Sequence, residues 1–263
     1  MLEKTKIQDG TIGKAFKLLD IVESFRAPVK FNDILENSPF PKPSTYRLLQ
    51  NLVNQDMLSH NQDTGHYMLG SRLIRLAHSS WQHASLAPIA APYLDALSDK
   101  TGETIHLAKL DHGQVLYLDK RNAKRPISMF SDAGKIAPAY CTGVGKAMLA
   151  FLPPAARDAM IAQQSFYPHT DHSLTRSDAL SGELDRIKQS GVAFDREEHE
   201  LNIICIAVPI LSESHRVMGG ISITSSTTRT SLELLGQYQH QLQQTAKEIG
   251  DHASAWMLPN MGG

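Results

Sequence analysis

Apolar residues recur at steps of three and four along the first part of the chain, a spacing typical of amphipathic helices. The pattern starts at Thr11, which can cap a helix, continues to Phe25, and predicts a first helix. A short second helix is expected over 32–36. A third is expected to begin at Pro43, because proline fits the first helical turn, where its missing N–H is not needed. Two short strands follow, separated by a polar turn that ends in Gly65.

Three helices followed by a strand pair are typical of a winged helix-turn-helix, which places the start of its third helix in the major groove of DNA. That helix carries polar and basic side chains that we expect to be exposed, and no acidic residue lies between Glu36 and Asp56. The pattern alone leaves open a helical dimerisation or scaffold unit whose polar face is only solvated. The residues predicted to contact DNA are Lys42, Pro43, Ser44, Thr45, Tyr46 and Arg47.

The rest of the chain changes from helical to strand periodicity. Helices are expected over 72–87 and 89–101, and a hairpin turn over 111–114. Further strands are predicted over 104–110, 115–119, 127–130, 192–195, 203–209 and 218–224, and further helices over 142–152, over 177–190 and in one long segment capped by Thr230 or Ser231. Strands flanked by helices at both ends of this region predict an α+β domain with a mainly antiparallel sheet.

Two helices carry more apolar residues than one buried face requires. This excess occurs in the first helix and in the stretch over 72–87, and it predicts a two-fold dimer that binds a near-palindromic DNA site. The residues concerned include Phe16, Ile21, Leu76 and Trp81.

Length and composition bound the class of protein. The 263 residues exceed one ordinary domain and suit two, and 41% hydrophobic with 20% charged residues is typical of a globular protein. No stretch approaches the about 18 uninterrupted apolar residues of a membrane helix. The N-terminal residues lack the apolar stretch of a secretory signal, so we expect a cytoplasmic protein without a membrane partner. Two distant cysteines, Cys141 and Cys205, favour a reducing compartment, and the net charge of −1 argues neither for nor against nucleic acid.

One segment resembles a phosphate-binding loop incompletely. Gly145 and Lys146 match the end of that motif, but Tyr140 stands where its first glycine is needed. Ala147 replaces the Ser or Thr that would bind magnesium. The sequence therefore predicts no nucleotide site here.

A second segment resembles a catalytic or metal-binding motif. His199 and Glu200 begin a metalloprotease motif, but Ile203 stands where its second histidine is required. The acidic run over 195–200 could supply an acid–base pair, although adjacent loop carboxylates are more often solvated. Because no Cys/His spacing matches a structural zinc site, the sequence predicts no catalytic residue, no metal and no cofactor.

A group of polar residues on apolar strands suggests a small-molecule pocket instead. The helix predicted to start at Gly143 presents free backbone N–H groups, which favour an anion, and glycine there allows close approach. Taken singly, each polar residue of the group could equally belong to an ordinary core. The group comprises Asp195 at a strand end, Cys205 within the next strand, and Ser222 and Thr224, which alternate and so share a face.

Several segments together resemble the IclR family of bacterial transcription regulators over nearly the whole chain. The most specific match is DREEHELNIICIAVPI followed by GGISIT, at 195–210 and 219–224. The other matching segments are PKPSTYRLLQNL at 41–52, GHYMLGSRLIRLA at 65–77, TGETIHLAKLDHGQVLYLDK at 101–120 and TGVGKAMLA at 142–150. One departure is Pro43-Ser44-Thr45, where the hydroxyls come one position later than is usual in the family, so the base contacts can differ.

The resemblance implies a winged helix-turn-helix domain over 9–70, a linker helix over 71–87 and an effector-binding domain of GAF-like topology over 88–257. It implies homodimers through the N-terminal domains, frequently paired into tetramers, that bind a double-stranded DNA operator. It also implies a small organic acid bound at the start of the helix after the TGVGKA-like motif. Matched residue by residue, the ligand-binding residues are Met129, Ala137, Gly143, Val144, Asp195, Cys205, Ser222 and Thr224.

The sequence thus predicts a sequence-specific, DNA-binding transcription regulator without catalysis. Its effector is expected to be a small carboxylate or sugar acid, and its target a catabolic operon. An enzyme or metal protein built on the C-terminal region is the first alternative, and it requires an activated nucleophile or consistently spaced metal ligands. A pure interaction scaffold is the second, and it predicts no sequence-specific DNA binding.

Overall fold

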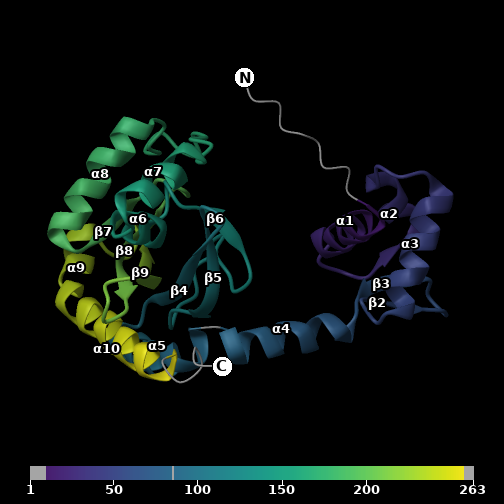
Figure 1. Ribbon diagram of the computed structural model, residues 1–263, viewed down its shortest axis with the longest axis horizontal. Helices are drawn as coiled ribbons and strands as arrows, with labels where there is room; N and C mark the ends of the chain where they lie inside the picture. Colours follow the sequence, from purple (N-terminus) through teal and green to yellow (C-terminus); the bar gives the residue numbers. More distant parts are fainter. Residues whose placement is uncertain (1–9, 85, 258–263) are drawn as a thin grey trace. The chain divides into compact units, whose positions relative to one another are not determined.

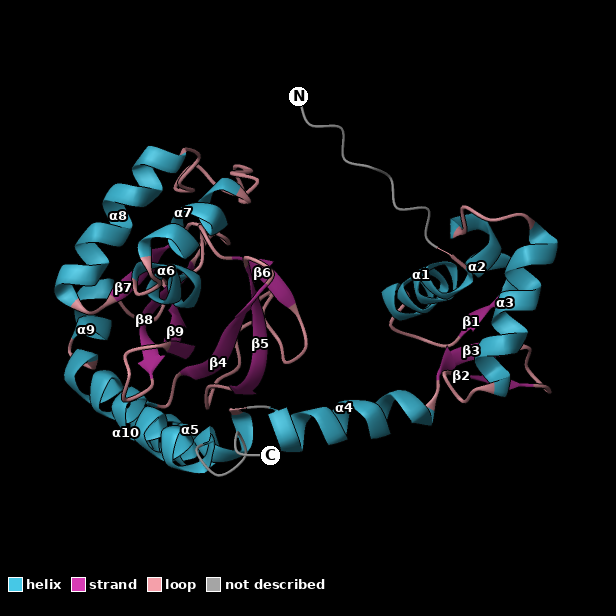
Figure 2. Cartoon of the chain, in the orientation of Figure 1, coloured by secondary structure: helices cyan, strands magenta, loops and turns pink. Residues whose placement is uncertain are grey.

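The computed structural model describes residues 10–84 and 86–257 (Figures 1 and 2). The chain divides into two compact units, Met1–Ala84 and Ser85–Gly263, and the described part of each has its own hydrophobic core. Residue 9, where the predicted first domain begins, and residue 85 of the predicted linker lie outside the described residues. None of the described helices has the length and apolar character needed to cross a membrane.

The first unit combines helices with a three-stranded antiparallel sheet of order β1-β3-β2. The two predicted strands and the helices before and after them are confirmed to within two residues at their starts. The short strand β1 was not predicted, because two residues are too few to show a period. The elements are α1 (Thr11–Ser24), β1 (Val29–Lys30), α2 (Phe31–Asn37), α3 (Lys42–Asn54), β2 (Leu58–Asn61), β3 (His66–Leu69) and α4 (Ser71–Ala84).

The core of the first unit forms where α1, α2 and α3 meet the small sheet. Leu18, Ile34 and Leu49 are fully buried there, which follows from the three- and four-residue spacing of apolar positions in each helix. Ile21 also belongs to this core and is 7% exposed, so its predicted place on a dimer surface is wrong. Its position on α1 puts it on the same face as Leu18.

The second unit is a six-stranded, entirely antiparallel sheet of order β6-β5-β4-β9-β8-β7 with helices on both faces (Figure 2). The predicted α+β class is confirmed. The strands are β4 (Thr104–Asp111), β5 (Gln114–Arg121), β6 (Ile136–Pro138), β7 (Ala193–Arg196), β8 (Ile203–Leu211) and β9 (Val217–Ser226). The helices are α5 (Ala87–Thr101), α6 (Gly143–Ala150), α7 (Pro154–Ala162), α8 (Ser177–Ser190), α9 (Leu232–Gly236) and α10 (Gln239–Met257).

Alternation along the central strands divides the second unit into two cores. Ile221 and Ile223 of β9 belong to the core beneath α5 and α10, whereas Cys205 and Ala207 of β8 belong to the core beneath α6 and α8. Successive residues of a strand point to opposite faces. Even-numbered residues of β9 therefore lie on the face that α6 covers, and this face carries the candidate site.

Two predicted elements of the second unit differ from the structure, and one helix was missed. The segment over 127–130 is not a strand, because the edge of the sheet is instead completed by β6, which pairs Ala137 with Val115. The long final helix is two helices, since α9 ends at Gly236 and α10 starts at Gln239. Helix α7 was not predicted at all. Two adjacent prolines, Pro153 and Pro154, begin it, and proline at a helix start is favourable.

Candidate functional site

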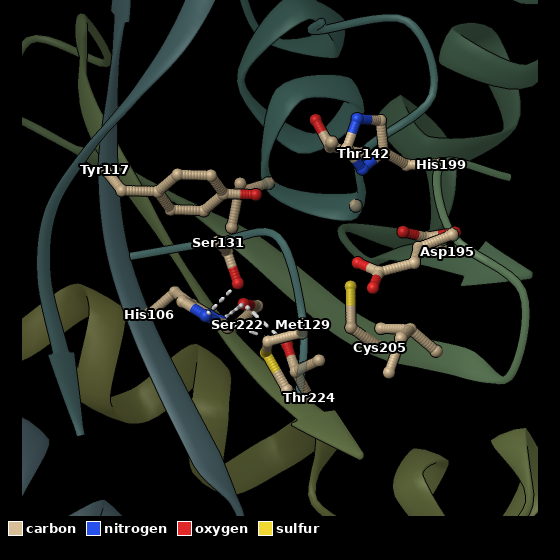
Figure 3. A pocket seen from close by; sticks show the side chains of 14 residues that line it. His106, Tyr117, Met129, Ser131, Thr142, Asp195, His199, Cys205, Ser222 and Thr224 are labelled. Carbon is tan, nitrogen blue, oxygen red and sulfur yellow. Dashed lines mark hydrogen bonds between the residues drawn. The ribbon is translucent and has the colours of Figure 1, made fainter. Parts of the chain in front are cut away.

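A small cavity lies between the N-terminal end of α6 and the sheet of the second unit (Figure 3). Its volume is about 30 Å³, which is room for about two water molecules. The fourteen lining residues come from the strands, from the start of α6 and from the loops that follow β5 and β7. They are His106, Tyr117, Met129, Ser131, Thr142, Gly143, Val144, Asp195, His199, Glu200, Ile203, Cys205, Ser222 and Thr224.

The register of the sheet places the strand residues of the cavity. Thr224 of β9 is paired with Cys205 of β8, which is paired with Asp195 of β7, so these three side chains form a row across the strands. Ser222 is paired with His106 of β4 in the neighbouring row. Residues directly opposite in antiparallel strands share a face. These residues, which are far apart in sequence, therefore form one continuous polar surface on the sheet.

His106 is the centre of a buried hydroxyl cluster on this surface (Figure 3). Its Nε2 is 2.8 Å from the Ser131 hydroxyl oxygen, and its Nδ1 is 3.2 Å from that of Thr224 and 3.4 Å from that of Ser222. Burial, followed by the nearby Lys120 charge, lowers the pKa of His106 to about 3. The imidazole is therefore neutral at physiological pH and has one N–H and one acceptor nitrogen to share among three hydroxyls.

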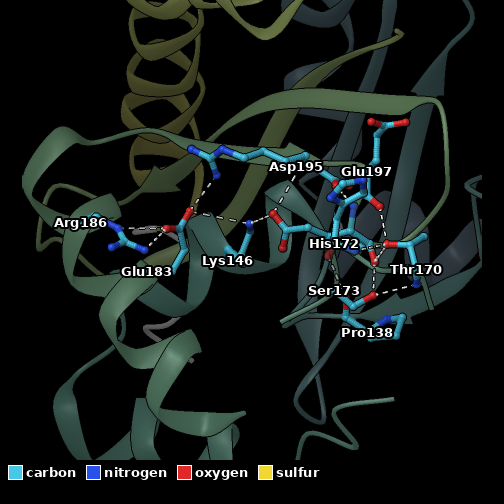
Figure 4. Close-up of polar contacts among 12 residues, drawn as sticks. Pro138, Lys146, Thr170, His172, Ser173, Glu183, Arg186, Asp195 and Glu197 are labelled. Atoms are coloured by element: carbon cyan, nitrogen blue, oxygen red, sulfur yellow. Dashed lines mark hydrogen bonds and ion pairs between the residues drawn. The ribbon is translucent and has the colours of Figure 1, made fainter. Parts of the chain in front are cut away.

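A buried network of acids with one buried lysine lies behind the cavity (Figure 4). Lys146 of α6 is fully buried and is bonded to Glu198, while its ammonium is 3.9 Å from the Glu183 carboxylate of α8. The backbone N–H of Glu198 donates to the Asp195 carboxylate at 2.8 Å. Burial, followed by repulsion from Glu198, raises the pKa of Asp195 to about 7. Lys146, which sequence comparison with nucleotide-binding loops singled out, thus holds the segment after β7 against α6.

Glycine at the start of α6 serves helix packing. A Cβ at Gly143 would overlap the Cys205 Sγ and lie 3.3 Å from the Ala207 side chain, and one at Gly145 would overlap the backbone of Ala139. The absence of a side chain at Gly143 therefore lets α6 pack closely against the sheet, whereas the prediction from sequence was that it allows close approach of a ligand. The first backbone N–H groups of α6 still point towards the cavity, since Gly143 and Val144 line it.

The mouth of the cavity is formed by two loops. The backbone N–H of Phe130 donates to the Glu200 carboxylate at 2.9 Å, and the Phe130 ring packs edge-on against His199 at 5.3 Å between centroids. Lys120 donates to the Ser131 carbonyl at 2.7 Å. Burial, followed by the neighbouring His169, lowers the pKa of His199 to about 4. The two loops are thus held together by the Phe130–Glu200 hydrogen bond and the Phe130–His199 ring contact.

Seven of the eight residues predicted from the sequence as ligand-binding line this cavity. The exception is Ala137, which is buried on β6 and is not among the lining residues, because its side chain packs in the core beneath α6. Among the residues that sequence reasoning missed, His106 could have been found, since alternation from Thr104 places it on a defined face. The loop residues Ser131 and His199 show no such pattern.

The start of α3 carries the residues predicted to contact DNA. Lys42, Tyr46 and Arg47 are exposed, as is Pro43, and Ser44 is half-buried. The predicted exposure of Thr45 is wrong. Its side chain is fully buried, donates to the Phe40 carbonyl at 3.2 Å and lies 3.1 Å from the Ser38 hydroxyl.

The role of Thr45 follows from the geometry of the turn between α2 and α3. Its hydroxyl and that of Ser38 satisfy polar groups of the turn, since the Phe40 N–H also donates to the Ser38 hydroxyl at 3.2 Å. Buried polar groups in a tight turn need such partners. Thr45 therefore orients the third helix and presents no side chain to DNA.

The described residues offer neither a metal site nor an activated thiol. No three His, Cys, Asp or Glu side chains gather there in a way that could hold a metal ion. Cys141 and Cys205 are both buried free thiols, and burial raises the pKa of each well above its usual range. Neither thiol has the lowered pKa of an activated nucleophile.

Comparison with known proteins covers both units. The family model "Bacterial transcriptional regulator IclR C-terminal" matches residues 78–251, and the model "IclR helix-turn-helix domain" matches residues 11–62. The HTH-type transcriptional regulator XynR of Escherichia coli is 28% identical over 234 residues, which are 89% of this chain and 93% of that protein.

Solved structures show the same fold. The Thermotoga maritima IclR crystal structure has a TM-score of 0.77 and 28% identity, with 91% of this chain and 97% of that chain covered. An IclR homologue of Microbacterium hydrocarbonoxydans, solved in complex with 4-hydroxybenzoate, has a TM-score of 0.79 and 21% identity, with 94% and 100% covered. Together with the family models, these relatives show that the chain belongs to the IclR family of bacterial transcriptional regulators, with a helix-turn-helix DNA-binding domain and an effector-binding domain.

Proposed function

We propose that this regulator binds a small organic acid in the cavity at the start of α6 and that this acid controls its binding to an operator. The observation that carries the proposal is the convergence of residues from β7, β8, β9 and α6 on one buried polar cavity. A helix N-terminus favours a carboxylate, and hydroxyls on the facing strand orient its oxygens. The cavity binds its ligand without converting it, and the characterised relatives are named as regulators.

The chemistry of the lining favours a short hydroxylated acid. Ser222, Thr224 and Ser131 supply hydroxyls on one side, while Met129 and Val144 supply apolar wall. Because the cavity holds only about 30 Å³, the loops at its mouth have to move when such a ligand enters. A sugar acid or related carboxylate of a catabolic pathway fits this lining, and the regulated operon would then encode its breakdown in the cytoplasm.

Operator binding is assigned to the exposed start of α3. Its support is that Lys42 and Arg47 are exposed at the start of the third helix, the part with which helix-turn-helix proteins contact phosphates and bases, and that Tyr46 is 54% exposed beside them. Thr45 is excluded by its burial. We propose a division into a DNA-binding domain over 9–70, a linker helix over 71–87 and an effector-binding domain over 88–257.

A second copy of the chain is the proposed partner of the first unit. A groove of about 480 Å³ is lined by α1, α3 and the start of α4, and apolar side chains remain exposed along it. Phe16 is 55% exposed and Leu76 is 54% exposed. The side chain of Trp81, which was expected to join them, lies outside the described residues. A two-fold dimer, able to pair further into a tetramer, would cover these residues.

Calorimetric titration of the full chain tests the ligand site. Candidate acids are 4-hydroxybenzoate, lactate and gluconate, and the variant is Ser222→Ala, whose hydroxyl lines the cavity. Losing one neutral hydrogen bond should weaken binding by about 0.5–1.5 kcal/mol, a factor of about 2–10. Ser225→Ala is the matched control, because Ser225 is equally buried on the same strand but at an odd-numbered position, on the opposite face. Equal effects of the two variants would place the ligand elsewhere.

A further inference from the structure

The cavity combines a proposed anionic ligand with an excess of buried acid. Asp195 is 7% exposed and Glu200 also lines the cavity, while Glu198, 3% exposed, lies directly behind Asp195. Among the described residues that line the cavity there is no Lys or Arg. A ligand carboxylate at the start of α6 would therefore meet carboxyl groups and no fixed cation.

The cation buried beside these acids pairs with Glu198 and does not enter the cavity lining. Lys146 is bonded to Glu198, and Arg196 donates to Glu183 at 3.0 Å from the surface side. Within the described residues, the Asp195 carboxylate accepts a hydrogen bond from the Glu198 backbone N–H at 2.8 Å. Several titratable and charged groups face Asp195 from the elements around it. They are Lys146 from α6, Tyr117 from β5, Cys205 from β8, Cys141 before α6, Arg196 at the end of β7, and Glu198 and Glu200 after β7.

When a ligand carboxylate enters beside Asp195, two carboxyl groups share one buried site, and such a pair retains one proton. Resting on the proposed function, we propose that Asp195 binds the ligand in its neutral form, so that the cavity takes up an acid as its anion together with one proton from solvent. The Asp195 O–H then donates to a ligand carboxylate oxygen, while the N–H groups of Gly143 and Val144 donate to the same carboxylate.

The electrostatics of the ligand-free cavity agree with this assignment. Burial and Glu198 already raise the pKa of Asp195 to about 7, so its proton is half-bound near neutral pH. A ligand anion adjacent to Asp195 adds a further negative charge and raises that pKa again. The strength of binding consequently depends on pH on the alkaline side of neutrality. Neutral His106 and His199 supply no compensating charge in that range.

Infrared spectroscopy of the full chain tests the proton without any ligand. A protonated carboxyl absorbs apart from carboxylates and amides. We expect such a band in the wild type at about pH 6, where ordinary Asp and Glu side chains are ionised, its loss as pH rises through about 7, and its absence in Asp195→Asn. Asp99→Asn, which removes an exposed carboxylate on α5, is the matched control and should keep the band. Absence of the band from the wild type on the acidic side, or its persistence in Asp195→Asn, overturns the proposal.

Calorimetry with 4-hydroxybenzoate, lactate and gluconate tests the coupling. Titrations in two buffers that differ in ionisation enthalpy should show uptake of nearly one proton above the Asp195 pKa. The association constant should fall about tenfold per pH unit there. Asp195→Asn, which keeps a neutral donor, should bind the same acid with no proton uptake and no such slope. The uncharged amide of the same acid should bind wild type without proton uptake.

The outcomes separate this inference from the proposed function. An acid that binds wild type above neutral pH without proton uptake overturns the inference and leaves the ligand class intact. If none of the three acids binds while the Asp195 band titrates near neutrality, the proposed ligand class fails and the neutral Asp195 stands. If the band is absent, neutral Asp195 is refuted whether or not an acid binds.

Discussion

Replacing Lys146 by Met should strongly destabilise the second unit. Lys146 is fully buried, and methionine fills much of its volume, so the lost interaction is mainly the ion pair with Glu198. Glu183 keeps its partners, since Arg186 lies at 2.8 Å and Arg196 at 3.0 Å. The carboxylate left without a cationic partner is therefore that of Glu198, which is 3% exposed. It still accepts a long hydrogen bond, of 3.4 Å, from the Arg196 backbone N–H. Breaking a buried pair in this way costs about 3–5 kcal/mol.

Urea unfolding of the full chain, followed by circular dichroism, measures this loss. With a urea dependence of about 2 kcal/mol per molar, the midpoint of the second unit should fall by about 2 M. The transition of the first unit should not move, because Lys146 lies wholly within the second. The double variant Lys146→Met with Glu198→Gln removes both charges and should recover most of the loss, which gives a large coupling energy. A single-variant loss below about 1 kcal/mol, or strictly additive losses, would refute the buried-charge reasoning.

Four further predictions follow from individual residues. As pH rises from about 4 to about 7, the wild type should lose stability relative to Asp195→Asn by about 1.4 kcal/mol per pH unit. The reason is that folded Asp195, with its raised pKa, retains a proton that the unfolded chain releases. Urea midpoints measured against pH test this, and a constant difference between the two proteins would contradict it. Arg47→Ala should weaken operator binding in a gel shift by about 1–3 kcal/mol if this side chain contacts a base, and unchanged binding removes it from the interface. Phe16→Glu should give monomers by light scattering where wild type gives dimers, since the charge falls in an apolar contact; persistence of the dimer would place the interface elsewhere. Gly143→Ala should lower the melting temperature, because the added Cβ overlaps the sheet. Gly182→Ala on α8, where the added Cβ meets open space, should instead raise stability by about 0.5–1 kcal/mol. Equal effects of the two variants would rule out a packing role for Gly143.

Local periodicity determined most of the elements that the sequence could predict. The helical spacing in α8 and the two-residue alternation in β9 are strong signals. Helix α8 has the predicted bounds, and β9 begins one residue earlier and ends two residues later than predicted. Alternation also implied that Ser222 and Thr224 share a face. The segment over 127–130 has apolar residues suited to a strand. Which segment pairs with β5 depends on residues distant in sequence, and in the structure that partner is β6.

Burial within a turn was harder to predict than burial within a core. Thr45 and Ser44 are adjacent hydroxyl residues at the start of one helix. Helical spacing puts Thr45 on the face of Leu48, Leu49 and Leu52, a signal that the prediction of an exposed polar cluster overlooked. The Phe40 carbonyl, 3.2 Å from the Thr45 hydroxyl, satisfies it there, and this partner depends on the path of the turn. The loop residues of the cavity pose the same difficulty, since Ser131 reaches His106 across 25 positions of sequence. The resemblance to a family supplied the ligand set that single residues could not.

The cavity is lined by residues of strands and by residues of loops, and the two differ in how freely they can be substituted. Ser222 and Thr224 alternate on β9 with Ile221 and Ile223, which pack in the opposite core, so a shift of this strand disturbs both faces. Residues such as Ser131 and His199 lie in loops, where substitution leaves the ladder of the sheet unchanged. Substitutions in these two loops can therefore change the size and polarity of the cavity while the strands and α6 keep their pairing. The lining of this fold can diversify there with less disturbance of the sheet than a substitution on β9 would cause.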